Sequence, residues 1–221
     1  MKKLTMLALV LMMFAGVANA QLRYGIKGGA NLTDIRSKND LIGTVDKAMH
    51  YQVGFLMQYR LGDFGIQPEL LYSEKGGTLK DVYPNSSYLT AGAGLNKANP
   101  DISLVTKNIE LPINFQYGLK IRQIRVYAQA GPYFSYTIGG TINDKKDLYS
   151  NVNDVFEFNK LDLGLGVGGG FEYKKFQLSA RYDFGLRPVG KEYLKQFSGV
   201  NYNPFYEMKN RNLTVSLAYL F

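Results

Sequence analysis

The chain has 221 residues with no Cys, no Trp and one His, which excludes a disulfide scaffold and any Cys-ligated or His-rich metal site. We therefore expect no cofactor. Lys and Arg total 26 against 18 Asp and Glu, and the net charge of +8 first suggests a nucleic-acid partner. A mean hydropathy of -0.17 argues against a bundle of membrane helices but not against a membrane β-barrel, whose strands are only half apolar.

Residues 1–20 are typical of a secretory signal peptide. A basic start, Met1-Lys2-Lys3, precedes an apolar run over residues 4–17, and Ala18-Asn19-Ala20 has the form of a cleavage site. An exported protein rarely meets nucleic acid, so we expect no nucleic-acid partner despite the basic composition.

The remaining residues, 21–221, show strict alternation of apolar and polar side chains, which marks strands with two different faces. Each alternating segment is long enough to cross a bilayer at a tilt, which takes about 9–11 residues. The eight predicted strands are 22–33, 51–61, 64–73, 109–118, 124–136, 161–173, 176–187 and 213–221.

The connections between these strands alternate in length. Three are short, at residues 62–63, 121–123 and 174–175, whereas four are long, at 36–47, 76–103, 139–157 and 188–209. This pattern is typical of outer-membrane barrels with extracellular long loops. We therefore expect residues 21–221 to form an all-β, eight-stranded, antiparallel, up-and-down transmembrane barrel in the outer membrane. Both termini are expected on the periplasmic side and the long loops outside the cell.

The apolar face is predicted to point to lipid. In a soluble eight-stranded barrel that face would point inward, but so narrow an interior has no room for this many large apolar side chains. The opposite face carries glycines and small polar residues, which suit a narrow lumen. Aromatic residues near the strand ends fit interfacial girdles: Tyr24, Tyr51, Tyr59, Phe64, Tyr72, Tyr117, Tyr136, Tyr173, Phe176 and Tyr219.

The same alternation directs charged side chains into the lumen, where a charge is costly unless it is paired. We expect a hydrogen-bonded network that fills the lumen in place of an open pore. Glu69 and Glu110 are predicted to pair with Arg60, Arg125 or Arg181 and to fix the register of the barrel. The full predicted set is Arg23, Lys27, Arg60, Glu69, Lys75, Glu110, Lys120, Arg125, Asp162, Glu172, Arg181, Asp183 and Arg187.

Two features of the sequence suggest chemistry, and neither predicts an enzyme. Residues 164–169 match the G-x-G-x-x-G pattern, but they lie inside an alternating strand and not at a strand-to-helix turn, so no phosphate loop is expected. His50 and Ser73 near the outer rim are residue types used by lipid-modifying outer-membrane barrels. Alternation turns both toward the lumen, so we expect His50 to be a hydrogen-bonded rim residue.

Several segments resemble the PorT-type outer-membrane β-barrel domain family, which is common in Bacteroidota. The matching segments are 25–32 (GIKGGANL), 67–76 (QPELLYSEKG), 109–113 (IELPI), 130–133 (AGPY), 166–173 and 181–186 (RYDFGL). The end of the chain is similar to the C-terminal signal that the barrel-assembly machinery reads, with Leu213, Val215, Leu217, Tyr219 and Phe221 on one face. The resemblance implies an eight-stranded barrel, and some family members are tied to protein secretion.

The sequence as a whole favours a structural or interaction role in the outer membrane. Loops position binding residues on rigid scaffolds, so we expect residues 76–103 and 188–209 to bind any protein partner. The other expected partners are outer-membrane lipids, lipopolysaccharide and, during biogenesis, the barrel-assembly machinery, with the protein itself a monomer. The alternatives are a small channel, a secretion accessory and a lipid-modifying enzyme.

Overall fold

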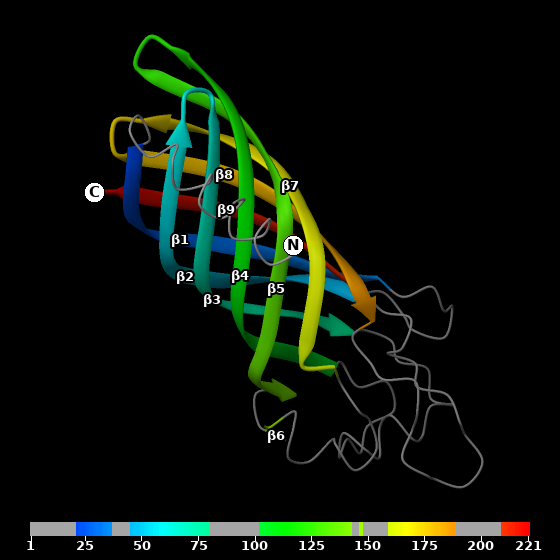
Figure 1. The fold of residues 1–221 in the computed structure, drawn as a ribbon. Helices are drawn as coiled ribbons and strands as arrows, with labels where there is room; N and C mark the ends of the chain where they lie inside the picture. The colour runs from blue at the N-terminus through cyan, green and yellow to red at the C-terminus, as the bar shows by residue number, and fades with distance from the viewer. Residues whose placement is uncertain (1–20, 37–44, 80–101, 143–145, 148–158, 189–208) are drawn as a thin grey trace, which may run out of the picture.

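The computed structural model describes residues 21–36, 45–79, 102–142, 146–147, 159–188 and 209–221, nearly all of them in strands or the short connections between them. The predicted signal peptide and the central parts of the long loops lie outside the described residues. The strands, labelled in Figure 1, are β1 (Gln21–Arg36), β2 (Val45–Leu61), β3 (Phe64–Leu79), β4 (Ile102–Ile121), β5 (Ile124–Ile142), β6 (Lys146–Asp147), β7 (Leu161–Tyr173), β8 (Phe176–Pro188) and β9 (Lys209–Leu220).

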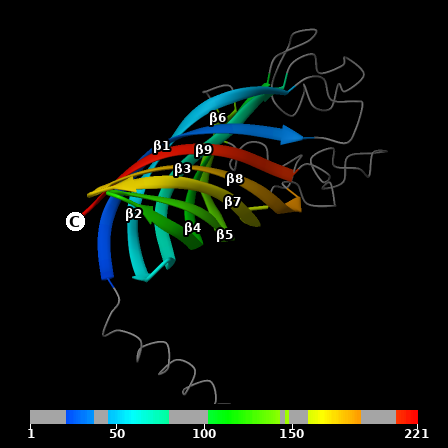
Figure 2. The ribbon, with the colours of Figure 1, turned by 90° about the horizontal axis from the view of Figure 1, so that it is seen from above.

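The long strands close into one antiparallel barrel. Hydrogen bonding follows the order β4-β3-β2-β1-β9-β8-β7-β5, and a β4–β5 pairing completes the ring. In Figure 2, β9 lies beside β1, so the first and last strands of the chain form a seam. This confirms the predicted eight-stranded barrel. The two-residue β6, which pairs only with the end of β5, was not predicted. None of the described segments forms a helix of the length and hydropathy that a membrane span requires.

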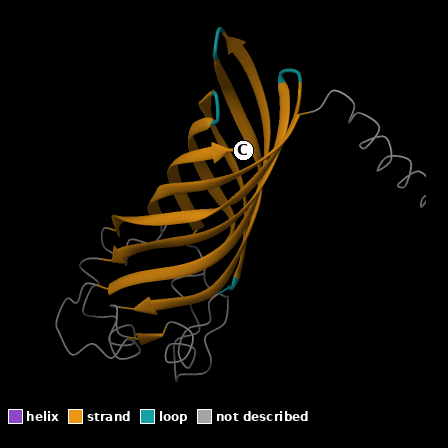
Figure 3. Cartoon of the chain, turned by 90° about the vertical axis from the view of Figure 1, so that its left-hand side faces the viewer, coloured by secondary structure: helices purple, strands orange, loops and turns teal. Residues whose placement is uncertain are grey.

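Three two-residue turns lie at one end of the barrel, where the sequence predicted short connections (Figure 3). The first residue of each turn has a positive φ: 59° at Gly62, 56° at Arg122 and 55° at Lys174. The C-terminus lies at this same end, because the Leu220 amide donates a hydrogen bond to the Lys175 carbonyl over 2.7 Å. We call this end the turn end and the opposite one the loop end.

Several strands extend further toward the loop end than predicted, and the four longest extensions belong to β2, β3, β4 and β5. β2 begins at Val45 and not at residue 51, β3 continues to Leu79 and β5 to Ile142, while β4 begins at Ile102 and not at 109. These extensions lack clean alternation, and register shifts interrupt them between Lys47 and Gln52 and between Lys107 and Asn108. Backbone hydrogen bonds, which do not depend on side-chain pattern, carry the ladders through them.

The outer wall is apolar, as predicted for a lipid-facing surface. Phe55 is 67% exposed, Leu70 49% and Leu217 53%. Aromatic side chains gather toward both ends of this wall. Rings pair at the turn end (Phe64 with Tyr117 and Phe176 with Tyr219) and further toward the loop end (Tyr51 with Tyr72 and Tyr182 with Phe184). This arrangement matches the interfacial girdles of membrane barrels.

Candidate functional site: the polar lumen

The inner wall is polar and almost completely inaccessible. Asn31, Gln58, Ser73 and Asn114 have no exposed surface at all. Eight charged side chains among the described residues are also buried, and four are basic and four acidic: Lys27, Lys75, Arg125, Arg181, Glu69, Glu110, Glu172 and Asp183. Buried polar groups are stable only when hydrogen-bonded, so the contacts inside the barrel decide what the lumen does.

A layer of glutamines crosses the turn-end half of the lumen. Gln67 of β3 and Gln177 of β8 lie on opposite sides of the barrel, and each amide donates to the other over 3.1 Å. Gln116 donates to Gln67 over 3.1 Å, and Gln58 donates to Gln67 over 3.2 Å and to Gln116 over 3.3 Å. A hydrogen bond between opposite walls requires that the space between them is filled.

A second layer joins ion pairs to amides in the centre. The Lys27 ammonium lies 2.8 and 3.0 Å from the two carboxylate oxygens of Glu69, and both side chains are buried. Asn114 also donates to Glu69, over 3.1 Å. Arg181 of β8 reaches across the lumen to donate to the Asn114 carbonyl, and it pairs with Asp183 over 2.6 Å. The chain of contacts therefore runs from β1 to β8 through β3 and β4.

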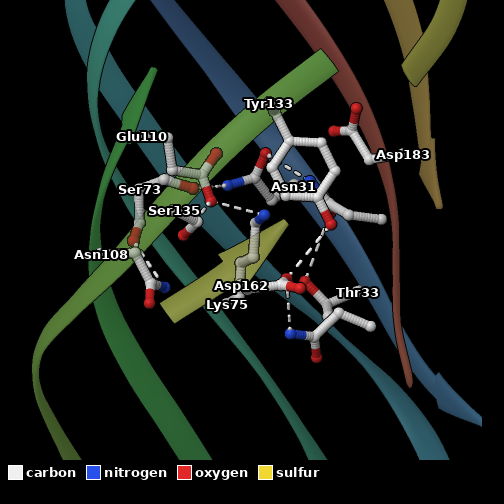
Figure 4. Close-up of polar contacts among 12 residues, drawn as sticks. Asn31, Thr33, Ser73, Lys75, Asn108, Glu110, Tyr133, Ser135, Asp162 and Asp183 are labelled. Carbon is white, nitrogen blue, oxygen red and sulfur yellow. Dashed lines mark hydrogen bonds and ion pairs between the residues drawn. The ribbon is translucent and has the colours of Figure 1, made fainter. Parts of the chain in front are cut away.

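A third cluster lies nearer the loop end (Figure 4). Lys75 pairs with Glu110 over 2.5 Å, and Ser135 donates to the same carboxylate over 3.2 Å. The Tyr133 hydroxyl donates to Asp162 over 3.1 Å, while its ring lies 5.2 Å from the Lys75 ammonium. This cluster also combines charge pairing with hydrogen bonds from neutral groups.

The fourth cluster, at the turn end, is different in its balance of charge. Glu172 accepts from Arg23 over 2.5 Å and from Arg60 over 3.2 Å, so one carboxylate serves two guanidinium groups. Arg125 donates to the Gln116 carbonyl over 3.2 Å and to the Asp63 backbone carbonyl over 3.1 Å. The Arg125 guanidinium also lies over the Tyr127 ring, 5.3 Å from the ring centre.

The glycine row in β7 makes room for these large side chains. A Cβ at Gly166 would collide with the Arg181 guanidinium and the Asp183 carboxylate, and one at Gly164 would collide with the Tyr133 ring. The G-x-G-x-x-G match is therefore accounted for by close packing inside a strand, as predicted.

Two predicted pairings are wrong. Glu69 pairs with Lys27 and Glu110 with Lys75, whereas the sequence predicted arginine partners for both. Lys27 is in register with Gly54 of β2, whereas the β2 partner of Glu69 is Leu56, so this ion pair joins residues two positions apart in the register. Alternation alone could not have revealed this, because it assigns a face but not a height along the tilted barrel.

The remaining predicted residues are less enclosed. Lys120 is exposed at the turn end and Arg187 is half-buried at the loop end, so neither belongs to the closed interior. Sequence reasoning left the glutamines and the inward tyrosines out of the network. These residues could have been found, because alternation places each of them on the inward face. They are Gln58, Gln67, Gln116, Gln129, Gln177, Tyr127 and Tyr133.

The proposed lipid-modifying pair is not assembled on the lipid-facing wall. Ser73 is fully buried in the lumen, where its hydroxyl accepts a hydrogen bond from Asn31 over 2.9 Å. His50 is half-buried, and its Nε2 atom has no hydrogen-bond partner among the described residues, contrary to the predicted rim contact. No group of three His, Asp or Glu suited to a metal ion occurs within the described part of the chain.

Comparisons with known proteins agree with this architecture. Residues 15–190 match the family model described as "Outer membrane protein beta-barrel domain". No curated protein matches the chain in sequence. The structure resembles a major outer membrane protein from Thermus thermophilus, with 14% identity, a TM-score of 0.50 and coverage of 90% of this chain and 99% of that one.

Two further solved structures are similar at a lower level. They are OprG from Pseudomonas aeruginosa (13% identity, TM-score 0.48, 91% of this chain and 95% of that one) and Neisserial surface protein A (14%, 0.47, 90% and 97%). At such identities the likeness to the Thermus protein concerns the fold alone. The family model covers most of the chain, and the protein therefore belongs to the outer membrane β-barrel domain family.

Proposed function

We propose that the protein is a closed outer-membrane barrel with a structural or interaction role, and that its long loops bind the partner. The observation that carries this proposal is the filled lumen. The mutual hydrogen bonds between Gln67 and Gln177 join opposite walls, and Arg181 contacts Asn114 across the same space. These contacts cross the space that a water-filled path would need, so neither the channel nor a transport role has support in the interior.

The decisive experiment is planar-bilayer conductance of the folded full-length protein. We expect no large, steady channels at symmetric high salt. A Gln67→Gly/Gln177→Gly/Arg181→Gly triple variant should show new, small conductance steps, because it removes both sets of contacts that cross the lumen. The matched control is Leu70→Ala, which shortens an exposed side chain on the outer wall of the same strand. Large steady channels in the unmodified protein would refute the closed-lumen proposal.

We further propose a family subgroup, a signal peptide, an assembly signal, lipid contacts and an orientation for the protein. Residues 67–76 support membership among PorT-type barrels, and residues 1–20 support removal of a signal peptide. The five alternating residues at the end of the chain (Leu213, Val215, Leu217, Tyr219 and Phe221) would be read by the barrel-assembly machinery. The aromatic belts favour direct contact with outer-membrane lipids and lipopolysaccharide. In the orientation that we propose, both termini face the periplasm, the protein is a monomer and the loops face outward.

A further inference from the structure

The turn end of the lumen opens into a pocket of about 360 Å³. The glutamine layer lies behind two of its lining arginines, since Gln58 accepts from Arg23 over 2.5 Å and Gln116 accepts from Arg125 over 3.2 Å. Because the glutamines bond across the barrel behind it, the pocket ends inside the lumen. It is therefore a place where a molecule could bind, and not the entrance of a channel.

The charge of this pocket is strongly one-sided. Its lining includes five cationic side chains and only two carboxylates, Asp63 and Glu172. The five cations come from four of the strands and from the turn that joins β7 to β8, and they are Arg23, Arg60, Lys120, Arg125 and Lys174. Cations gathered in a recess with low-dielectric walls focus a positive potential at its mouth.

Two of the guanidinium groups in the pocket retain an unused donor. Among the described residues, the buried Nε atoms of Arg23 and Arg125 have no hydrogen-bond partner. Glu172 is 6% exposed and serves both Arg23 and Arg60, whose side chains are 17% and 22% exposed. A buried donor without a partner costs free energy, and Arg23 and Arg125, which both line the pocket, each carry one such donor.

We propose that this pocket binds a small multivalent oxoanion of the phosphate ester or pyrophosphate class. Guanidinium groups bind such anions through paired N–H donors, and Arg23 and Arg60 are already held in place by their shared carboxylate. The excess of three positive charges matches an anion that carries two to three negative ones. The volume suits a ligand of that size and is too small for a nucleic-acid duplex.

The test is calorimetric titration of pyrophosphate into the folded full-length protein in phosphatidylcholine nanodiscs at constant ionic strength. We expect saturable binding at one site. Arg60→Gln should weaken it about tenfold and Lys120→Gln about threefold, since each removes a positive charge from the pocket. Lys120 is exposed, so its variant keeps the test valid even if Arg60→Gln does not fold.

The matched control uses two neighbours in one turn. Lys174 lines the pocket, whereas the Lys175 ammonium lies 5.7 Å from the Tyr219 ring on the outer wall. Lys174→Gln should weaken binding about threefold and Lys175→Gln should leave it unchanged. Equal weakening by both variants would refute the pocket and indicate a general surface charge effect. Absence of saturable binding to the unmodified protein would refute it outright.

A second set of nanodiscs, containing phosphatidic acid, identifies the source of the anion. If a lipid headgroup enters the pocket, the terminal phosphate of phosphatidic acid should compete with pyrophosphate and lower its apparent affinity. If the ligand is a free phosphate compound, the lipid composition should leave that affinity unchanged. Both results require an oxoanion site that depends on Lys174, and neither depends on the conductance of the barrel.

Discussion

The interior of the barrel has two regions with different charge balance. In the centre and toward the loop end, Lys27 faces Glu69, Lys75 faces Glu110 and Arg181 faces Asp183, so each cation has a carboxylate. At the turn end, five cations line a pocket with two carboxylates. The comparison shows that paired charges hold the walls together, while the surplus lies where solvent or a ligand can reach it.

The difference also gives the basic composition of the chain a structural meaning. The eight buried charged side chains of the described residues balance to zero. The surplus of Lys and Arg that first suggested nucleic acid is therefore not part of the closed interior. Within the lumen, it concentrates at the turn-end pocket.

The largest expected effect on stability comes from breaking an ion pair in the balanced region, by which we mean the centre and loop-end part of the lumen, where each cation has a carboxylate. Lys27→Met leaves the Glu69 carboxylate buried without its cation, and removing one partner of a buried ion pair costs about 3–5 kcal/mol of unfolding free energy. The measurement is the urea midpoint for loss of the folded band on unheated gels, which suits a chain without Trp.

A double variant separates charge from packing at this position. Lys27→Met/Glu69→Leu replaces both charges with apolar side chains and should recover most of the lost stability. By contrast, Lys174→Gln in the turn-end pocket should leave the urea midpoint unchanged. If Lys27→Met is as stable as Lys174→Gln, the two regions do not differ in the way that we describe.

A smaller effect is expected from overfilling the balanced region. A Cβ at Gly131 on β5 would collide with the Ile113 backbone carbonyl of β4. Since backbone gives way less easily than a side chain, Gly131→Ala should cost about 2 kcal/mol. Gly28→Ala is the matched control, because its Cβ would come no closer than 4.0 Å to the Gln52 carbonyl oxygen. Equal urea midpoints for the two variants would contradict the close packing of the wall.

The smallest effect concerns a turn at the edge of the pocket region. Arg122 adopts a φ of 56°, a left-handed conformation that costs an L-residue roughly 1–2 kcal/mol. Arg122→Gly should therefore raise the stability by up to about 1 kcal/mol, seen as a higher urea midpoint. Gln123→Gly, next to it in the same turn, should give no gain. A loss of stability in Arg122→Gly would show that the side chain does more than complete the turn.

Most of the wall could be predicted from the sequence, because side-chain alternation is a local property of each strand. It correctly placed Glu69, Glu110 and Arg181 inside and Phe55 and Leu217 outside. The partners of Glu69 and Glu110 could not be predicted, because they depend on the tilt and stagger of the closed barrel.

The strand ends were also beyond the reach of the pattern. Near the loop end, register shifts such as the one between Lys107 and Asn108 break the alternation while the backbone pairing continues. The glutamine layer was missed for a different reason. The predicted network was selected by charge, so neutral side chains such as Gln67 were left out. Their buried amides nevertheless need hydrogen-bond partners as much as charged groups do.

The seam between β1 and β9 has a consequence for how the molecule forms. Gly25 pairs with Leu220 and Arg36 with Lys209, so the ring cannot close until β9 is in place beside β1. Contacts between residues so distant in sequence slow folding. The bonds between Gln67 and Gln177 likewise need both halves of the chain to be in place. Closure and filling of the lumen should thus occur together as the last event of assembly, and an unclosed sheet would hold unpaired lysines and carboxylates open to its surroundings.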